Sequence, residues 1–349
     1  MIEKPSAPMA LALDSAALKA NWQWLAQKSG PAACGAAIKA NAYGLGAIRV
    51  LDHLKAAGCR DFFVATWREA AEVMPYLDGV SLSVFHGVRE EDMAFALNSP
   101  VRPVLNSPEQ IARWKAANGG PCDIMIDTGM NRLGLDANDV KADLFEGLQI
   151  ETLMSHLACA DEPNHQLNMI QPMILKQMSR RVGAKRLSLA NSAGIMAGES
   201  FLFDLTRPGL SLYGGIQRSE GAGHIRQVVT PRAQIIQRRT IRGGESVGYG
   251  ATYVPDSQRD AAIINIGYAD GYFRGFSNMG SARRGDLLLP VMGRVSMDLV
   301  TIDISNAPDL KEGDWLDLDF DLPTASAESG MSQYELLTSL NRRFLRDWY

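Results

Sequence analysis

The segment AIKANAYGLG, residues 37–46, places a lysine where an apolar run ends and a polar, glycine-spaced loop begins. Lys39 follows the apolar residues 36–38, so we predict that it ends a buried strand. Burial disfavours the charged form of an amine and lowers its pKa, which prepares a lysine to form a Schiff base with an aldehyde. A lysine at a strand end is also commonly a solvated structural residue, so other residues of the chain must distinguish a catalytic role from a structural one.

Polar side chains also follow several later apolar runs. They are Arg132 in DTGMNRLG, His156 in LMSHLA, Asn191 and Ser192 in ANSAG, and Arg207 in DLTRPG. If these runs are the parallel strands of a barrel, their carboxyl ends share one mouth, where such barrels place active sites. The sequence therefore predicts that an amine, two guanidinium groups and an imidazole converge.

The last two of these loops also carry the features of a phosphate site. Ser192 supplies a hydroxyl, and the glycine-containing stretch RPGLSLYGG supplies backbone amides near Gly209 and Leu210. Alone, such residues are equally typical of helix caps. Together with a strand-end lysine they indicate pyridoxal 5′-phosphate, which needs both a Schiff-base amine and a phosphate cradle.

The elements that must position these residues recur along the first two thirds of the chain. Apolar runs lie at 35–38, 62–65, 81–85, 101–105, 123–126, 150–154, 186–190 and 202–205. Amphipathic helical stretches such as 66–77 and 107–118 separate them. This α/β pattern predicts a (β/α)8 TIM-type barrel, with a doubly wound open sheet as the alternative.

The hydropathy pattern changes after about residue 220, where alternating and apolar runs are separated by glycine turns. We therefore predict a barrel domain over 1–220 and a mainly β domain over 221–349, joined at 217–224 and closed by a helix over 334–345. Residues up to about 10 could instead pack with the β domain.

Composition excludes several classes of function. The net charge of −4 gives no reason to expect nucleic acid or an anionic membrane as a partner. We find no leader-like segment and no apolar run long enough for a bilayer, so we expect a cytoplasmic protein. The four cysteines and five histidines are scattered without metal-ligand spacing, so we expect no metal.

Eight segments together resemble, in order, the signature segments of bacterial alanine racemases. They are AIKANAYGLG, DTGMNRLG, SHLACADE, ANSAG, RPGLSLYGG, VGYGATY, GYADGYFRG and VMGRVSMD, and the resemblance extends from about residue 10 to 320. It implies a barrel followed by a β domain, pyridoxal phosphate, a homodimer with shared active sites, and interconversion of L- and D-alanine. It also implies that the enzyme supplies or consumes D-alanine, a peptidoglycan precursor.

The resemblance implies two catalytic bases. Lys39 would hold the cofactor as an internal aldimine and act on one face of the substrate. Tyr249, in VGYGATY, would act on the opposite face from the β domain of the other subunit. His156 and Arg207 would favour the phenolate form of this tyrosine, and Arg207 would also donate to the pyridine nitrogen.

The remaining implied roles concern binding. Tyr43, Asn191 and Ser192, with the amides of Gly209 and Leu210, would contact the cofactor and chiefly its phosphate. Arg132 and the backbone amide of Met297 would approach the substrate carboxylate, and Tyr268 and Asp298 would line the substrate entrance.

The chain departs from the family at two places. Many members have a carbamylated lysine seven residues before the arginine of DTGMNRLG, but this chain has Met125 there. We hypothesise that a bound inorganic anion, such as chloride, or Asn131 orients Arg132 instead. Many members also have a C-terminal gate tyrosine, where this chain has Leu340 or Asn341. A looser gate would admit serine or larger amino acids.

Three alternatives stay open from the sequence. The chain could racemise another amino acid, such as serine or lysine, or have broad specificity, by the same two-base chemistry. It could be a non-catalytic pyridoxal phosphate-binding protein, although such single-domain proteins lack an opposing tyrosine. A related decarboxylase would usually bring a catalytic cysteine in its second domain, whereas this chain has no cysteine after Cys159.

Overall fold

The computed structural model describes residues 5–138 and 140–349, and its contacts divide the chain into two compact units. The barrel unit comprises Leu18–Ala42 and Gly46–Arg226. The β unit comprises Gln227–Tyr349, the described residues before Leu18, and the short segment Tyr43–Leu45. The division between barrel and β residues therefore falls after Arg226 rather than after residue 220.

The barrel unit contains a parallel ladder in the order β2-β11-β10-β9-β7-β6-β5-β4-β3. Its strands are β2 (Ala33–Cys34), β3 (Ala36–Ala37), β4 (Asp61–Val64), β5 (Ser81–Val84), β6 (Arg102–Leu105), β7 (Cys122–Asp127), β9 (Ile150–Met154), β10 (Arg186–Ser188) and β11 (Leu205–Thr206). A short strand, β8 (Leu135–Asp136), pairs with β7. The parallel order around a closed circuit confirms the predicted barrel and excludes the open sheet.

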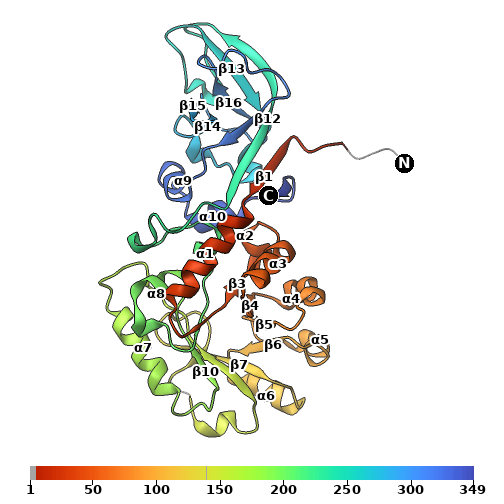
Figure 1. The fold of residues 1–349 in the computed structure, drawn as a ribbon, viewed down its shortest axis with the longest axis vertical. Helices are drawn as coiled ribbons and strands as arrows, with labels where there is room; N and C mark the ends of the chain where they lie inside the picture. The colour runs from red at the N-terminus through yellow and green to blue at the C-terminus, as the bar shows by residue number, and fades with distance from the viewer. Residues whose placement is uncertain (1–4, 139) are drawn as a thin grey trace. The chain divides into compact units, whose positions relative to one another are not determined.

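Helices cover the outside of this ladder (Figure 1). They are α1 (Ser15–Lys28), α3 (Ala47–Ala57), α4 (Trp67–Val73), α5 (Met93–Leu97), α6 (Pro108–Ala116), α7 (Leu167–Met178) and α8 (Ser192–Ala197). The two connecting helices predicted from the sequence begin at side-chain caps, Thr66 for α4 and Ser107 for α6. Each cap accepts a backbone hydrogen bond three residues on, which satisfies an otherwise unpaired donor.

The first strand closes the barrel because it is bent at Gly35. Its first half, β2, pairs with β11, and its second half, β3, pairs with β4. A Cβ atom at Gly35 would lie 2.7 Å from the carbonyl oxygen of Asp61 and 3.2 Å from that of Thr206. Glycine is needed here because two neighbouring backbones approach it closely.

The interior of the barrel is layered. At the amino ends of the strands, Asp61 accepts two hydrogen bonds from Arg186, at 2.8 and 3.1 Å, and the buried Asp123 accepts one from Ser83 at 2.6 Å. Apolar side chains fill the middle: Phe63, Val104, Met125, Met154 and Leu205, with Phe85 against them. The carboxyl ends are thus the remaining layer, and they carry Lys39 and the other candidate residues.

The β unit is built around the long strand β12 (Val229–Ile241), whose first half alternates buried and half-buried residues. Its sheet order is β15-β14-β17-β12-β1-β18, and β13 pairs with both β12 and β16. The bounds are β1 (Met9–Leu13), β13 (Arg259–Ile264), β14 (Ser281–Arg284), β15 (Leu287–Pro290), β16 (Val300–Asp303), β17 (Trp315–Leu318) and β18 (Leu345–Trp348). Strand β1 runs antiparallel to β12, so Met9–Leu13 belong to this sheet.

The closing helix predicted over 334–345 is wrong in its length. Two short helices, α9 (Leu322–Ser329) and α10 (Gln333–Thr338), precede the last strand, β18. The guanidinium group of Arg346 donates to the carbonyl oxygens of Gly44, Leu340 and Asn341, which holds the chain after α10 away from helical geometry. Parallel pairing of β18 with β1 then outweighs the local helical pattern.

Within residues 5–138 and 140–349, none of the helices has the length and hydropathy that a bilayer crossing requires.

We expect Gly35→Ala to destabilise the barrel by about 1–3 kcal/mol, because the added methyl group would force the backbones of β4 and β11 apart. Urea unfolding monitored by circular dichroism measures this change. Gly183→Ala is the matched control, since a Cβ at Gly183 meets nothing within 4 Å. Equal stabilities of the two variants would contradict the role of Gly35 in closing the barrel.

Candidate active site

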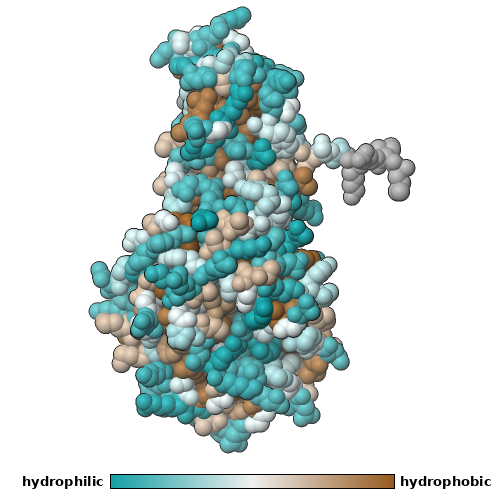
Figure 2. Space-filling model, viewed as in Figure 1, coloured by the Kyte–Doolittle hydropathy of each residue, from teal (hydrophilic) through white to brown (hydrophobic). Residues whose placement is uncertain are grey.

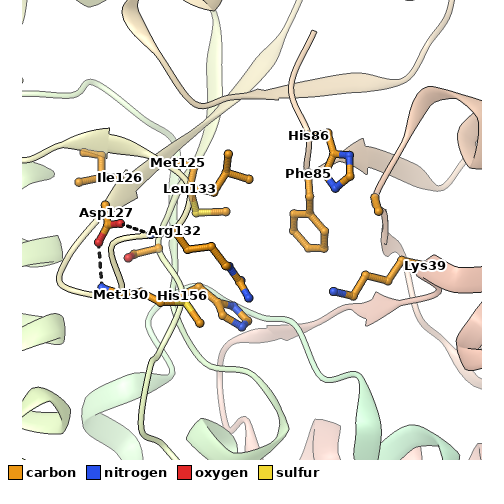
Figure 3. A pocket seen from close by; sticks show the side chains of 12 residues that line it. Lys39, Phe85, His86, Met125, Ile126, Asp127, Met130, Arg132, Leu133 and His156 are labelled. Atoms are coloured by element: carbon orange, nitrogen blue, oxygen red, sulfur yellow. Dashed lines mark hydrogen bonds between the residues drawn. The ribbon is translucent and has the colours of Figure 1, made fainter. Parts of the chain in front are cut away.

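Lys39 lines a cavity of about 390 Å³ at the carboxyl ends of the barrel strands. Figure 3 shows its amine pointing into this cavity, towards the side of Arg132 and His156. Burial lowers the pKa of the Lys39 amine, the charge of Arg132 lowers it further, and the charge of Glu69 opposes them. The structure therefore places an amine of lowered pKa in the cavity, which is the environment that a nucleophilic lysine needs.

Arg132 reaches the same cavity from the loop after β7. This loop is shaped by Asp127, whose Oδ1 accepts hydrogen bonds from the amides of Gly129 and Met130 and whose Oδ2 accepts one from the amide of Arg132 at 3.0 Å. Because the carboxylate is occupied by backbone amides, it organises the turn rather than pairing with the guanidinium group. Met125 lies in the wall of the cavity.

His156 lies in the same cavity wall and is held in its neutral form. Burial lowers the pKa of its imidazole to about 3, with further lowering by the charges of Arg207, Arg132 and Lys39. A neutral imidazole has one donor and one acceptor nitrogen, so His156 can relay a hydrogen bond near neutral pH.

Arg207 is the most enclosed cation of the group, with an exposed fraction of 4%. Its guanidinium group donates to the hydroxyl of Ser188 and, at 2.5 Å, to the carbonyl oxygen of Ser155. It also lies 6.0 Å from the centre of the Phe63 ring. Burial lowers its pKa to about 10, so it remains charged at neutral pH.

The predicted phosphate residues lie close together in the loops after β10 and β11. Asn191 caps α8 and accepts a hydrogen bond from the amide of Gly194 at 2.9 Å. The hydroxyl of Ser192 accepts from the amides of Gly209 at 3.0 Å and Ser211 at 3.2 Å. Leu210 begins the next short helix, so its amide has no partner inside that helix.

The Ser211 hydroxyl beside this group is fully buried and has no hydrogen-bond partner among the described residues. Buried hydroxyl groups without a partner are uncommon in folded proteins. The hydroxyl groups of Ser192 and Ser211 and the amide of Leu210 are therefore the donors that this region offers to an anion.

Tyr43 belongs to the β unit together with Gly44 and Leu45. Its ring centre lies 6.1 Å from that of Tyr334 on α10, and burial raises the pKa of its hydroxyl. Its predicted contact with a phosphate stays a prediction.

Tyr249 lies on a turn of the β unit that an isolated bridge between Val247 and Tyr253 closes. Its side chain is 66% exposed. The turn packs against a second loop, because a Cβ at Gly250 would lie 3.0 Å from the guanidinium group of Arg294. The phenol is thus presented on the surface of this unit by a fixed loop.

The other predicted β-domain residues lie in loops beside this one. The amide of Tyr268 donates to the carbonyl oxygen of Ser296, and a Cβ at Gly267 would lie 2.3 Å from the carbonyl oxygen of Met297. Asp298 accepts a hydrogen bond from Arg343 at 2.8 Å. The β unit therefore brings Tyr268, Met297 and Asp298 into neighbouring loops.

Neither residue considered for the position of the gate tyrosine projects an aromatic ring. Leu340 is buried, and the side-chain amide of Asn341 donates to the carbonyl oxygen of Ala269 and to Asp270. These contacts support the loop that carries Tyr268.

Sequence reasoning missed several residues that hold the site. Ser188, Ser155 and Phe63 contact Arg207, and Phe85 and His86 line the cavity. The sequence could have indicated the two serines, because a polar residue within an apolar strand faces either a hydrogen-bond partner or a binding site.

Two family models together match nearly the whole chain. The model described as "Alanine racemase, N-terminal domain" matches residues 13–217, and "Alanine racemase, C-terminal domain" matches residues 228–348. The alanine racemase of Acidiphilium cryptum is 39% identical over 96% of this chain and 97% of its own length. That of Cereibacter sphaeroides is 40% identical over 96% and 97%.

Solved structures agree with these matches. The crystal structure of alanine racemase from Bartonella henselae with covalently bound pyridoxal phosphate has a TM-score of 0.91 at 34% identity, and the match covers 99% of this chain and 100% of that one. The biosynthetic alanine racemase from Pseudomonas aeruginosa has a TM-score of 0.87 at 30% identity, with the same coverage.

The lowered pKa of His156 makes the stability of the cofactor-free protein depend on pH. Below pH of about 6.5 the unfolded chain binds a proton at this histidine, whereas the folded chain does not until about pH 3. Stability therefore falls as the pH falls through this window. Between pH 7.5 and 5 we expect this residue alone to account for ~2 kcal/mol of lost unfolding free energy.

Urea unfolding of the wild type and His156→Gln at the two pH values measures this loss. The variant should lose about 2 kcal/mol less than the wild type. His165→Gln, at an exposed histidine, is the control and should follow the wild type. Parallel pH dependence of wild type and His156→Gln would show that the folded protein does not hold the imidazole in its neutral form.

Proposed function

Because this chain belongs to the alanine racemase family, we propose that it interconverts L-alanine and D-alanine with pyridoxal 5′-phosphate as its cofactor. The observation that carries the proposal is the cavity where the nucleophilic Lys39 faces Arg132 and His156. The β unit supplies Tyr249. Because the chain matches both domains of the family, it contains both the lysine-bearing and the tyrosine-bearing domain.

The residues of the barrel unit fit pyridoxal phosphate. An aldehyde needs an amine with a lowered pKa, which Lys39 provides. A phosphate needs hydrogen-bond donors, and we assign the hydroxyl of Ser192 and the amide of Leu210 to it. The amide of Gly209 donates to the Ser192 hydroxyl and so orients it, and Asn191 caps the start of α8. When bound, the cofactor supplies an electron sink that acidifies the α-hydrogen of an amino acid.

Arg207 would lie against the pyridine nitrogen of this cofactor. A guanidinium group can only donate a hydrogen bond, so it would leave that nitrogen unprotonated. Its bonds to Ser188 and Ser155 hold the group in place. Since an unprotonated ring withdraws electrons less strongly, Arg207 would limit side reactions such as transamination.

The remaining assignments concern the substrate and the cofactor phosphate. Arg132 binds the substrate carboxylate through a charge-assisted hydrogen bond, aided by the backbone amide of Met297. Tyr268 and Asp298 line the entrance, and Tyr43 contributes its hydroxyl to the cofactor phosphate. These assignments rest on the family resemblance and on the loops that present the residues.

Racemisation requires a proton to leave one face of the α-carbon and another to arrive at the opposite face. Nζ of Lys39 holds or releases the proton on one face, and the phenolic oxygen of Tyr249 does so on the other. A phenol is a weak base in water, so Tyr249 depends on neighbours that favour its phenolate. We assign the stabilisation of this phenolate to the neutral His156 together with the charged Arg207.

We further propose that the enzyme is a homodimer in which Tyr249 acts in the site of the partner. Tyr249 and Met297 are 66% and 53% exposed in the single chain, although our proposal assigns both to the site. Figure 2 also shows hydrophobic residues gathered on the β unit over β15 and β16, and Leu288 of β15 is 48% exposed. Exposed apolar patches of this kind are typical of protein interfaces.

A cytoplasmic location and a part in supplying or consuming D-alanine for peptidoglycan belong to the same proposal. Alanine is the substrate that the family match favours over serine, lysine or a broad set.

We expect Tyr249→Phe to bind pyridoxal phosphate but to lose racemase activity by about 10²-fold or more in kcat, because it lacks one of the two bases. Tyr253→Phe, a tyrosine on the same turn that packs against an apolar cluster, is the matched control and should retain activity. Visible absorbance reports cofactor binding, and a chiral assay with L- and D-alanine reports turnover. Full activity in Tyr249→Phe would exclude the two-base assignment and leave a different residue on that face.

We also expect an inorganic anion beside the guanidinium group of Arg132, in the place that a carbamylated lysine fills in many relatives. Met125 cannot be carbamylated, and Asp127 uses both oxygens for backbone amides. Anomalous scattering from crystals grown in bromide should show a peak within hydrogen-bond distance of Arg132. A well-ordered Arg132 without such a peak would reject the anion and leave Asn131 as its support.

A further inference from the structure

The chain immediately after Lys39 is strained. Residues 40–43 all have φ angles between 52° and 54°, and none of them is glycine. Left-handed backbone costs an L-residue on the order of 1–2 kcal/mol per residue. Such a run persists only where surrounding contacts impose it. Some part of the structure must therefore hold this turn.

Part of the support is local. The amide of Ala42 donates to the carbonyl oxygen of Ile38 at 2.8 Å, and Asn41 accepts hydrogen bonds from the amides of Gly46 and Ala47, each at 2.9 Å. These bonds tie the end of the turn to the start of α3. They do not involve the first strained residue, Ala40.

The amide of Ala40 is bound by a side chain from another part of the barrel. It donates to Oε1 of Glu69 at 2.6 Å. The other oxygen of Glu69, Oε2, accepts from the amides of Ala65 at 2.7 Å and Thr66 at 3.1 Å. One carboxylate thus joins the segment after β3 to the segment after β4.

Glu69 also belongs to the capping box of α4. Its own amide donates to the hydroxyl of Thr66 at 3.2 Å, and its side chain accepts from the amide of Thr66. The cap fixes the carboxylate, because a capping-box glutamate is held at the helix start by its bonds to the backbone. The helix therefore serves as an anchor for the turn that follows Lys39.

The corresponding residue of α6 shows why position 69 is a glutamate. Gln110 likewise lies three residues after a capping residue, and its Oε1 accepts from the amide of Asn106 at 2.9 Å. Its Nε2 reaches back to the preceding strand end and donates to the carbonyl oxygen of His86 at 3.4 Å. A glutamine fits there because it meets a carbonyl. Glu69 meets an amide at Ala40, so it needs a second acceptor.

We propose that Glu69 is a positioning residue that holds the left-handed turn after Lys39 and so fixes where the Lys39 amine stands in the cavity. The role in holding the turn follows from the backbone bonds alone. The consequence for cofactor capture rests on the proposed function.

Glu69 also acts on the amine through its charge. The charge of Glu69 raises the pKa of Lys39, against burial and against the charge of Arg132. His156 faces the same cavity and is neutral. Removal of the carboxylate should therefore lower the pKa of Lys39 further, besides loosening the turn.

Two variants separate the turn from the helix cap. Glu69→Gln keeps the size of the side chain, but its NH₂ group cannot accept a hydrogen bond, so an amide at Ala40, Ala65 or Thr66 loses its partner. Thr66→Ala removes the cap hydroxyl and leaves all three bonds of Glu69 in place. The comparison isolates the link to Ala40 from fraying of α4.

The first experiment measures hydrogen exchange of peptides covering residues 38–45 and 66–73 in the cofactor-free protein. We expect exchange at 38–45 to be about tenfold or more faster in Glu69→Gln and within about twofold of the wild type in Thr66→Ala. Unchanged exchange in Glu69→Gln, or equal acceleration in both variants, would overturn the proposal.

The second experiment follows capture of pyridoxal phosphate by visible absorbance across pH. The midpoint pH for capture should be lower in Glu69→Gln than in the wild type and unchanged in Thr66→Ala, a shift that loss of packing alone would not produce. If the wild type captures no cofactor while exchange responds as expected, the proposed function fails and the role of Glu69 in the turn stands. If the wild type captures cofactor and exchange does not respond, only the role of Glu69 fails.

Discussion

The site depends on positive charge that the barrel gathers and does not neutralise. Lys39, Arg132 and Arg207 lie at the carboxyl ends of three different barrel strands. The charge of Arg132 adds to the cost of burying Lys39, and all three charges add to the cost of protonating His156. That cost lowers the pKa of Lys39 and keeps His156 neutral. It also makes the cavity attractive to ligands with negative groups, which a phosphate and a carboxylate both supply.

Two carboxylates beside Lys39 and Arg132 bind backbone amides instead of the cationic groups. Asp127 binds the amides of the turn that carries Arg132, and Glu69 binds the amide that follows Lys39. Both therefore set the backbone while leaving the cationic groups available to a ligand. Arg207 is likewise held by a hydroxyl and a carbonyl oxygen instead of an ion pair. Preorganisation of this kind avoids reorganisation when a ligand binds.

Much of this arrangement could be predicted from the sequence because it follows from local pattern. The alternation of apolar runs and capped helices predicts the barrel, and strand ends predict where Lys39, Arg132, His156 and Arg207 stand. Motif resemblance was needed for Tyr249, since nothing in its own spacing distinguishes it from a structural tyrosine.

The rest depends on contacts between residues far apart in the chain. The bend at Gly35 is visible only once β4 and β11 lie on either side of it. The last strand, β18, forms because β1 offers an unpaired edge, a tertiary effect that overrides helical periodicity. The positive φ angles after Lys39 could not be foreseen from alanine, asparagine and tyrosine, because only Asn41 has any preference for them.

The wall beside Arg132 shows how one substitution changes what a site requires. Met125 belongs to the apolar layer formed with Phe63, Val104, Met154 and Leu205, so at this position the layer extends to the cavity without a polar break. A charged group at position 125 would need partners that this layer lacks. The methionine is therefore compatible with its neighbours, and negative charge for Arg132 must come from the solvent or the ligand. The same apolar wall that stabilises the barrel thus leaves Arg132 dependent on what the cavity binds.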